Sequence, residues 1–192
     1  MDTKRNSEFL EILKSKLPQK RLYHSICVAE QAERLARLYC PDYCEKAYTA
    51  GLIHDIMRNS TPEEMIEIIE KGGQRLTPLE KKVTVTLHAP AGESYLRTVL
   101  GVTDEEILSA VRYHTTGREN MSLFEKIIYT ADLTSEDRDY PDVNEVRATA
   151  EKDLDRAVLR GLAFTIEDNA KRLRPIHPDT LNAFNYLAER IK

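Results

Sequence analysis

The chain has 192 residues and a formal net charge of -4, with 28 Lys and Arg residues against 32 Asp and Glu residues. Hydrophobic residues make up 41% of it, which at this length is enough to bury a large core without disulfides and argues against disorder. The near-neutral charge argues against a dedicated nucleic-acid binder, which would need a net basic face to release phosphate counterions.

The three cysteines indicate a reducing compartment. Cys27, Cys40 and Cys44 are odd in number and form no Cys-x-x-Cys pair, which favours free thiols over a disulfide framework. The N-terminal stretch mixes charges with its apolar positions, unlike a signal peptide, and no apolar run approaches the ~20 residues that span a bilayer. We therefore expect a soluble, cytoplasmic protein with no membrane partner, and we do not expect nucleic acid as a partner.

Four expected helix starts carry the pattern of a Ser or Thr followed three residues later by Glu. Such pairs cap the first helical turn reciprocally, and apolar residues recur at helical spacing between them. The pairs are Thr61 with Glu64, Thr77 with Glu80, Thr103 with Glu106, and Ser122 with Glu125. In chain order, the patterns predict helices over residues 7–17, 19–40, 43–57, 62–71, 78–88, 90–100, 104–114, 122–133, 143–172 and 178–191.

Three segments qualify this pattern. Residues 83–87 alternate like a strand, but they lie inside a capped segment, so we predict that they are helical. A break is expected near Glu151–Asp155. The charged segment Thr134–Asp142, which contains Pro141, is predicted to be the longest loop.

No repeat, low-complexity tract or flexible linker divides the sequence. We therefore predict one all-α domain over residues 1–192, with its helices packed around one core. Within it, we expect the core that carries the functional site at about residues 20–140 and C-terminal helices at about residues 143–191.

Four of the five histidines lie on or beside the apolar stripes of their predicted helices. A single histidine in such a place is more often a hydrogen-bonded core residue than a ligand, and the dipeptide His54-Asp55 alone decides nothing. The group is harder to explain in this way, because burying several imidazoles and carboxylates without a partner is costly. A divalent metal ion provides that partner. The candidate ligands are His24, His54, Asp55, His88, His114 and Asp132.

The composition of this set indicates the kind of metal site. Imidazoles and carboxylates without thiolates suit Fe, Mn, Zn and related divalent ions, and six ligands exceed what one tetrahedral site uses. A bridging carboxylate such as Asp55 would hold two ions about 3.5–4 Å apart, the arrangement used to cleave phosphate esters and anhydrides. The sequence contains no ferritin-like Glu-x-x-His pair, no glycine-rich nucleotide loop and no nucleophile elbow.

The ordered set His, His-Asp, His, His, Asp resembles the pattern of the HD-domain metal-dependent phosphohydrolases. The flanking segments are similar to those of the bacterial symmetrical bis(5'-nucleosyl)-tetraphosphatases within that family. These segments are Arg21–His24, Gly51–Arg58, Leu87–Gly92, Tyr113–Arg118, Tyr129–Asp132 and Arg138–Pro141. After Asp132 the branch usually continues with Ile-Glu-Pro, whereas this chain reads Leu133–Asp137. The departure concerns substrate contacts rather than the metal site, since Asp132 and Arg138 keep their places.

The resemblance, which covers about residues 20 to 175, implies an HD-type helical bundle with two divalent metal ions. It favours iron, with manganese, cobalt, nickel or zinc as alternatives. One ion would be held by His24, His54, Asp55 and Asp132, and the other by Asp55, His88 and His114. Two cations lower the pKa of a shared water, so hydroxide becomes available to attack phosphorus. The implied reaction converts diadenosine tetraphosphate into two ADP molecules, and a homodimer is compatible with the resemblance.

Cations of the chain itself are expected to bind the substrate phosphates, and we predict Asp55 and Arg58 to be catalytic. A forked guanidinium matches phosphate oxygens best. The predicted substrate contacts are Arg58, Arg118, Arg138, Arg21, Thr115 and Thr116. The alternative for each arginine is an exposed surface pair worth about 0–1 kcal/mol, and the Thr-Thr-Gly-Arg segment is equally typical of a helix end.

Two other functions fit the same residues. The first is an HD-domain phosphohydrolase that acts on another nucleotide, such as a nucleoside monophosphate or a cyclic dinucleotide. The second is a non-catalytic helical adaptor or nucleic-acid-binding bundle whose histidines are structural. The remaining histidine, His177, lies in a proline-bounded turn, and we predict that it is a helix-cap or loop residue.

Overall fold

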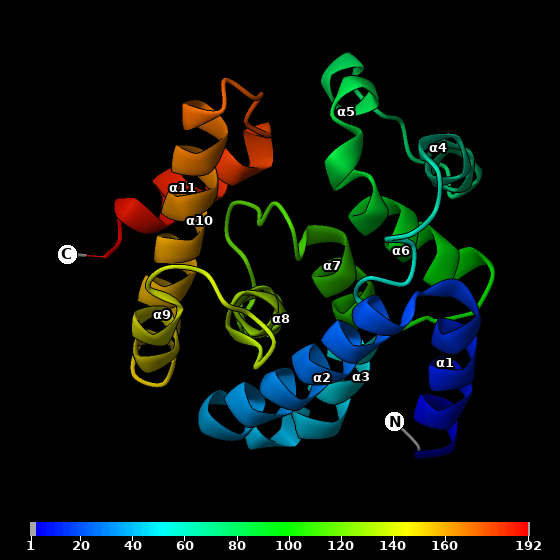
Figure 1. Cartoon of the computed structure of the whole chain (residues 1–192), viewed down its shortest axis with the longest axis horizontal. Coiled ribbons are helices and arrows are strands. Elements are labelled where there is room, and N and C mark those ends of the chain that lie inside the picture. The colour runs from blue at the N-terminus through cyan, green and yellow to red at the C-terminus, as the bar shows by residue number, and fades with distance from the viewer. Residues whose placement is uncertain (1–2, 192) are drawn as a thin grey trace.

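The chain forms helices throughout residues 3–191, the part that the computed structural model describes, and no β-strand occurs in that range (Figure 1). The all-α prediction is confirmed. Residues 1–2 and 192, the ends of the predicted domain, lie outside the described residues. The elements are α1 (Thr3–Lys16), α2 (Gln19–Tyr39), the 3-10 helix η1 (Pro41–Tyr43), α3 (Cys44–Ile53), α4 (Pro62–Lys71), α5 (Pro78–Lys82), the 3-10 helix η2 (Thr84–Thr86), α6 (His88–Thr98), α7 (Glu105–Tyr113), α8 (Leu123–Thr134), α9 (Val143–Ala150), α10 (Leu154–Lys171) and α11 (Pro178–Ala188).

Helix starts follow the capping pattern, with one correction. The capping boxes that begin at Thr61, Thr77 and Ser122 are all present. The predicted box at Thr103 is wrong, because Asp104 caps α7 instead and accepts hydrogen bonds from the backbone N–H groups of Glu106 and Ile107. An aspartate cap also places a negative charge at the positive end of the helix dipole.

The helix predicted over residues 7–17 begins earlier, at Thr3, and the one predicted over residues 178–191 ends earlier, at Ala188. The two largest errors at C-terminal helix ends lie beside histidines of the candidate site. The helix predicted over residues 43–57 ends at Ile53. There the Gly51 carbonyl accepts a hydrogen bond from the His54 side chain. The segment predicted as helix over residues 83–87 is a turn and the 3-10 helix η2. Its run of β-branched residues has low helix propensity, so the α-helix stops at Lys82.

The later loops give one confirmation and one correction. The expected break near residue 151 is confirmed, because α9 ends at Ala150 and α10 begins at Leu154 behind the capping Asp153. The segment after α8 is not the longest connection. Residues 114–122, between α7 and α8, form a longer one in the described chain.

Helices α2 and α3 pack closely because a glycine faces the contact. A Cβ atom added to Gly51 would lie 2.8 Å from the Cα of Ala29 and 2.9 Å from the carbonyl oxygen of Val28, closer than real Cβ atoms come. Small residues let two helix backbones approach, and this approach brings the end of α3 beside the middle of α2.

Helix α8 contributes to two hydrophobic clusters. Ile127 and Ile128 belong to a large cluster formed with α1–α4, α6, α7 and the start of α10, while Tyr129 belongs to a smaller one. The smaller cluster consists of Met121, Tyr129, Val158, Leu162, Ala183 and Leu187. In Figure 1, α8 is seen end-on between α9–α11 on one side and α2, α3 and α7 on the other. Among the described residues, no helix is both long and apolar enough to cross a membrane.

Candidate metal centre

The six side chains expected to bind metal lie together, although they are spread over more than half of the sequence. Five of them are at most 4% exposed as residues, and the side chain of Asp132 is 18% exposed. They come from α2 (His24), the turn after α3 (His54 and Asp55), the start of α6 (His88), the turn after α7 (His114) and the last turn of α8 (Asp132).

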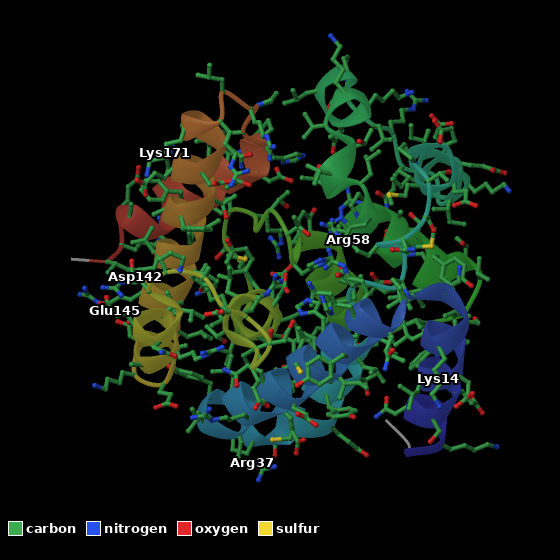
Figure 2. The ribbon with its side chains drawn as sticks, viewed as in Figure 1. Lys14, Arg37, Arg58, Asp142, Glu145 and Lys171 are labelled. Carbon is green, nitrogen blue, oxygen red and sulfur yellow. The ribbon has the colours of Figure 1, made fainter. Side chains whose placement is uncertain are left out.

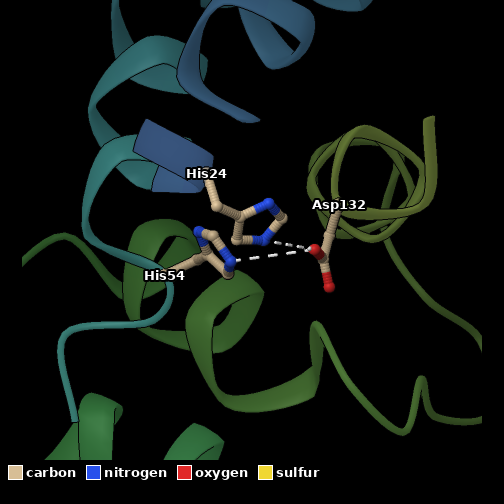
Figure 3. Close-up of side chains that lie close together, drawn as sticks. All are labelled: His24, His54 and Asp132. Carbon is tan, nitrogen blue, oxygen red and sulfur yellow. Dashed lines mark ion pairs between the residues drawn. The ribbon is translucent and has the colours of Figure 1, made fainter. Parts of the chain in front are cut away.

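One half of the cluster is centred on Asp132 (Figure 3). Its Oδ1 atom lies 3.0 Å from His24 Nε2 and 3.8 Å from His54 Nε2. The two imidazole rings are 5.3 Å apart and nearly perpendicular. These three side chains form a group whose ligand atoms could hold one metal ion.

The other half is centred on Asp55, whose two oxygens face different neighbours. Its Oδ1 atom lies 3.3 Å from His88 Nε2 and 3.5 Å from His114 Nε2, while Oδ2 lies 3.7 Å from His54 Nε2. The Thr115 hydroxyl lies 3.0 Å from the Nε2 atoms of both His88 and His114. His54, Asp55 and His114 form a second group able to hold an ion. Asp55 thus lies between the two halves, where a bridging carboxylate is expected.

The imidazoles are held by their Nδ1 atoms. His54 Nδ1 donates a 2.7 Å hydrogen bond to the carbonyl of Gly51, and His114 Nδ1 donates one of 2.7 Å to Val111. A carbonyl only accepts, so both Nδ1 atoms carry the proton and both Nε2 atoms present a lone pair to the cluster. Among the described residues, His54 Nε2 is one of few buried side-chain atoms without a hydrogen-bond partner. This arrangement fits a divalent metal ion.

The protonation states also suit metal ligands. Burial lowers the pKa of His54 to about 4, and burial together with the nearby His114 lowers that of His88 to about 3. Burial would raise the pKa of Asp55, but the positive potential of His54 and the other histidines lowers it overall. At neutral pH His54 and His88 are therefore neutral and Asp55 is ionised, the forms that bind metal. His24 differs, because burial would lower its pKa but the hydrogen bond and charge of Asp132 outweigh burial and raise it.

Three of the predicted arginines lie at the cluster. Arg58 Nη1 lies 2.8 Å from His88 Nδ1 and donates a 3.1 Å hydrogen bond to the carbonyl of Val85. Arg21 Nη1 lies 3.6 Å from Asp55 Oδ2. Figure 2 shows Arg58 near the middle of the molecule, away from the peripheral charged residues that it also labels. Burial lowers the pKa of the Arg58 guanidinium.

Arg138 holds Asp132 in place. Its Nε atom donates a 2.7 Å hydrogen bond to the backbone carbonyl of Asp132, and Nη2 pairs with the carboxylate Oδ1. Burial would raise the pKa of Asp132, but the charge of Arg138 and a hydrogen bond from His24 hold it well below its usual range. Arg138 therefore adds positive charge beside the ligand oxygen.

The structure does not bring Arg118 and Thr116 to the cluster. Arg118 forms a forked pair with the buried Glu125, at 2.8 Å through Nε and 2.9 Å through Nη2. The Thr116 hydroxyl donates to the carbonyl of Gly117 at 2.9 Å. His177, as predicted, is a helix cap: it precedes α11 and accepts a hydrogen bond from the backbone N–H of Asp179.

Asp137 is a neighbour of the cluster that the sequence patterns missed. Its Oδ2 atom lies 2.8 Å from His24 Nδ1. The two residues are 113 positions apart, and no local spacing links them. The available signal was its position, because Asp137 lies in the segment between Asp132 and Arg138 that departs from the expected family sequence.

Residues 21–137 match the family model described as HD domain, a range that contains all six candidate ligands. The chain belongs to the HD domain family. The HD domain resemblance inferred from the sequence is thereby confirmed, and the match extends to the segment that carries Asp137.

Relatives of this HD domain cover nearly the whole chain. It is 41% identical to the "Bis(5'-nucleosyl)-tetraphosphatase, symmetrical" of Halalkalibacterium halodurans, across 93% of this chain and 94% of the relative. The protein of the same name from Bacillus subtilis is 37% identical, across 94% and 96%. A crystal structure from Clostridium acetobutylicum, titled as a predicted HD superfamily hydrolase involved in NAD metabolism, has a TM-score of 0.93 and 38% identity, covering 96% of this chain and 97% of that one.

Proposed function

We propose that this protein is a symmetrical bis(5'-nucleosyl)-tetraphosphatase, which hydrolyses diadenosine tetraphosphate with one water molecule to two ADP molecules. The observation that carries the proposal is the convergence of imidazole Nε2 atoms on the oxygens of Asp55 and Asp132. Relatives named for this activity are 34% to 41% identical over most of the chain.

Two divalent ions would occupy the cluster, with Asp55 bridging them. His24, His54, Asp55 and Asp132 would hold one ion, and Asp55, His88 and His114 would hold the other. Iron is our preferred metal, and manganese, cobalt, nickel and zinc accept the same ligands. The bound ions would offset phosphate charge and lower the pKa of the attacking water.

The arginines at the cluster would bind the polyphosphate chain. Arg21, Arg58 and Arg138 lie beside the ligand carboxylates or histidines, where guanidinium groups favour phosphate oxygens. Thr115 would donate its hydroxyl to a phosphate oxygen near His88 and His114. Arg118 and Thr116 would act indirectly, by holding the turn that follows α7. In this scheme Asp55 positions the ions, and Arg58 stabilises charge on the reacting phosphate.

The identity of the product tests the reaction. Protein purified anaerobically and supplied with ferrous or manganese ions is incubated with diadenosine tetraphosphate, and the nucleotides are separated by chromatography. We expect ADP as the sole nucleotide product. Equal amounts of AMP and ATP would contradict symmetrical cleavage, and a stronger activity on another member of a nucleotide panel would favour the alternative phosphohydrolase.

Substitution of Asp55 tests the site. We expect Asp55→Ala to abolish both metal retention and turnover, because it removes the oxygens that face both groups of histidines. Metal content is measured by elemental analysis, and circular dichroism checks that the helices are retained. Full activity in this variant would show that the site is wrong, and metal-free wild-type protein would favour a non-catalytic helical module.

The wider setting follows from the same proposal. We propose a cytoplasmic location, supported by the free thiols of Cys27, Cys40 and Cys44, which suit a reducing compartment. We also propose that the helices form one domain and that the protein acts as a homodimer. Light scattering during size-exclusion chromatography measures the second point, and a monomeric mass would contradict it.

A further inference from the structure

The histidines of the metal centre are not anchored alike. His54 and His114 donate from Nδ1 to the carbonyl three residues earlier, so their own helix ends hold them. The Nδ1 atom of His24 instead faces the carboxylate of Asp137 at 2.8 Å. On the other side of the same ring, Nε2 lies 3.0 Å from Asp132 Oδ1.

The Asp137 carboxylate is itself fixed. Ser135 donates its hydroxyl to Asp137 Oδ1 at 2.7 Å, which leaves Oδ2 for His24. Arg147 of α9 donates to the backbone carbonyls of Thr134 at 3.0 Å and Ser135 at 2.7 Å, and so anchors the loop. Although the loop lies at the surface, the Asp137 side chain is only 20% exposed.

We propose that Asp137 is a positioning residue, which orients His24 through Nδ1 so that Nε2 faces the metal ion shared with Asp132. A carboxylate behind a ligating imidazole fixes its tautomer and ring orientation and makes Nε2 a better donor to metal. The inference rests on the two-ion site proposed above. It implies that the loop after α8, which is far from His24 in sequence, determines how tightly the protein binds the metal ion at His24.

The chain offers matched variants for a test. Asp137→Ala removes the acceptor, and Asp137→Asn retains a neutral oxygen of nearly the same shape that still accepts from Nδ1–H. Glu136→Gln removes one negative charge at the adjacent exposed position and is the control for net charge. Circular dichroism verifies that each variant is folded.

The measurement is a calorimetric titration of each metal-free protein with manganese ions alone. We expect two ions to bind the wild type and Glu136→Gln equally. Asp137→Ala should weaken one of the two ions by ~10–100-fold and leave the other unchanged, as is usual when a partner of a ligating histidine is lost. The affinity of Asp137→Asn for that ion should lie between those of the wild type and Asp137→Ala, because this variant keeps the hydrogen bond and loses the charge.

The outcomes separate this inference from the proposal on which it rests. If Asp137→Ala binds both ions as the wild type does, Asp137 does not position His24, and the two-ion site stands. If both ions weaken equally in Asp137→Ala, the effect is general and the inference is wrong. If the wild type binds no manganese, the two-ion proposal fails and takes this inference with it.

Discussion

Arg58 and Arg118 differ in where their guanidinium groups lie, and this difference separates a candidate phosphate contact from structural support. Arg58 lies against His88, with its Nη1 atom 2.8 Å from Nδ1 and 3.4 Å from Nε2. Arg118 donates hydrogen bonds from two of its nitrogen atoms to the carboxylate of Glu125. The same residue type, predicted from the sequence to do the same work, is therefore placed in two different settings.

Substituting each arginine with alanine should distinguish a role in turnover from a role in stability. Arg58→Ala is expected to lower kcat/KM for diadenosine tetraphosphate by ~100-fold or more, because a cation facing the reacting phosphate is lost. Arg118→Ala should lower the free energy of unfolding by about 1–3 kcal/mol, because buried Glu125 loses a charged partner. Steady-state kinetics and urea unfolding measure both. A larger loss of kcat/KM in Arg118→Ala than in Arg58→Ala would contradict this division.

At the residue scale, the sequence predicted the ligands better than their supports. The six candidate ligands could be predicted to lie together because imidazole and carboxylate on apolar stripes require a partner, which is a property of the residues themselves. The supports depend on long-range placement. Nothing near Asp137 in sequence marks a contact with His24, and nothing near Arg118 distinguishes a fork to Glu125 from a phosphate contact.

The ends of the helices and their closest contacts determine how far apart the side chains of the site lie. Helix α3 stops where His54 takes the carbonyl of Gly51, and the same glycine faces α2. The segment at residues 83–87 shows where the capping and periodicity patterns predicted the wrong structure. Its place inside a capped run suggested helix, but four consecutive β-branched residues end α5, and the chain turns so that His88 begins α6.

Gly51→Ala should disturb the site through this helix contact. The added Cβ atom would meet the backbone of Ala29 and Val28, so we expect a loss of about 1–3 kcal/mol in the free energy of unfolding together with weaker metal retention. Gly73→Ala is the control. That residue has a φ of +79°, which strains alanine, but no atom lies within 4 Å of the added Cβ. Similar metal retention in wild type and Gly51→Ala would show that the contact does not set the site.

The start of α8 should make stability depend on pH. Burial would raise the pKa of Glu125, but hydrogen bonds from Arg118 and Ser109 outweigh it, so the pKa is lowered. As the pH falls, the Glu125 carboxylate is therefore protonated in the unfolded state before it is protonated in the folded state. The stabilisation is complete above the ordinary Glu value of 4.5 and is lost as the pH falls below it.

Glu125→Gln tests this dependence. We expect it to lower the free energy of unfolding at neutral pH by about 1–3 kcal/mol and to show a smaller further loss below pH 4.5 than the wild type. Urea unfolding at several pH values measures both quantities. Parallel acid losses in the two proteins would contradict the assignment to Glu125.

At the scale of the whole molecule, α8 connects the C-terminal helices to the metal centre. It contributes Tyr129 to the smaller hydrophobic cluster and Ile127 and Ile128 to the larger one, and it carries the candidate ligand Asp132. A helix shared in this way couples the two clusters, so we expect them to unfold together.

Leu162→Ala should report on this coupling. Leu162 is fully buried in the smaller cluster, so we expect a loss of about 2–5 kcal/mol in the free energy of unfolding. Circular dichroism and tyrosine fluorescence should still give one coincident urea transition. Leu173→Ala is the control, because Leu173 is 94% exposed. Two separate transitions would show that the C-terminal helices fold independently.

The distribution of the ligands along the chain has a consequence for synthesis on the ribosome. The first of the six candidate ligands is His24 and the last is Asp132, and the loop that follows Asp132 carries Asp137. A growing polypeptide emerges from its N-terminus, at about 5–20 residues per second. The nascent chain therefore exposes histidines for several seconds before α8 emerges to complete the cluster, and a metal ion captured earlier would have only part of its final ligand set.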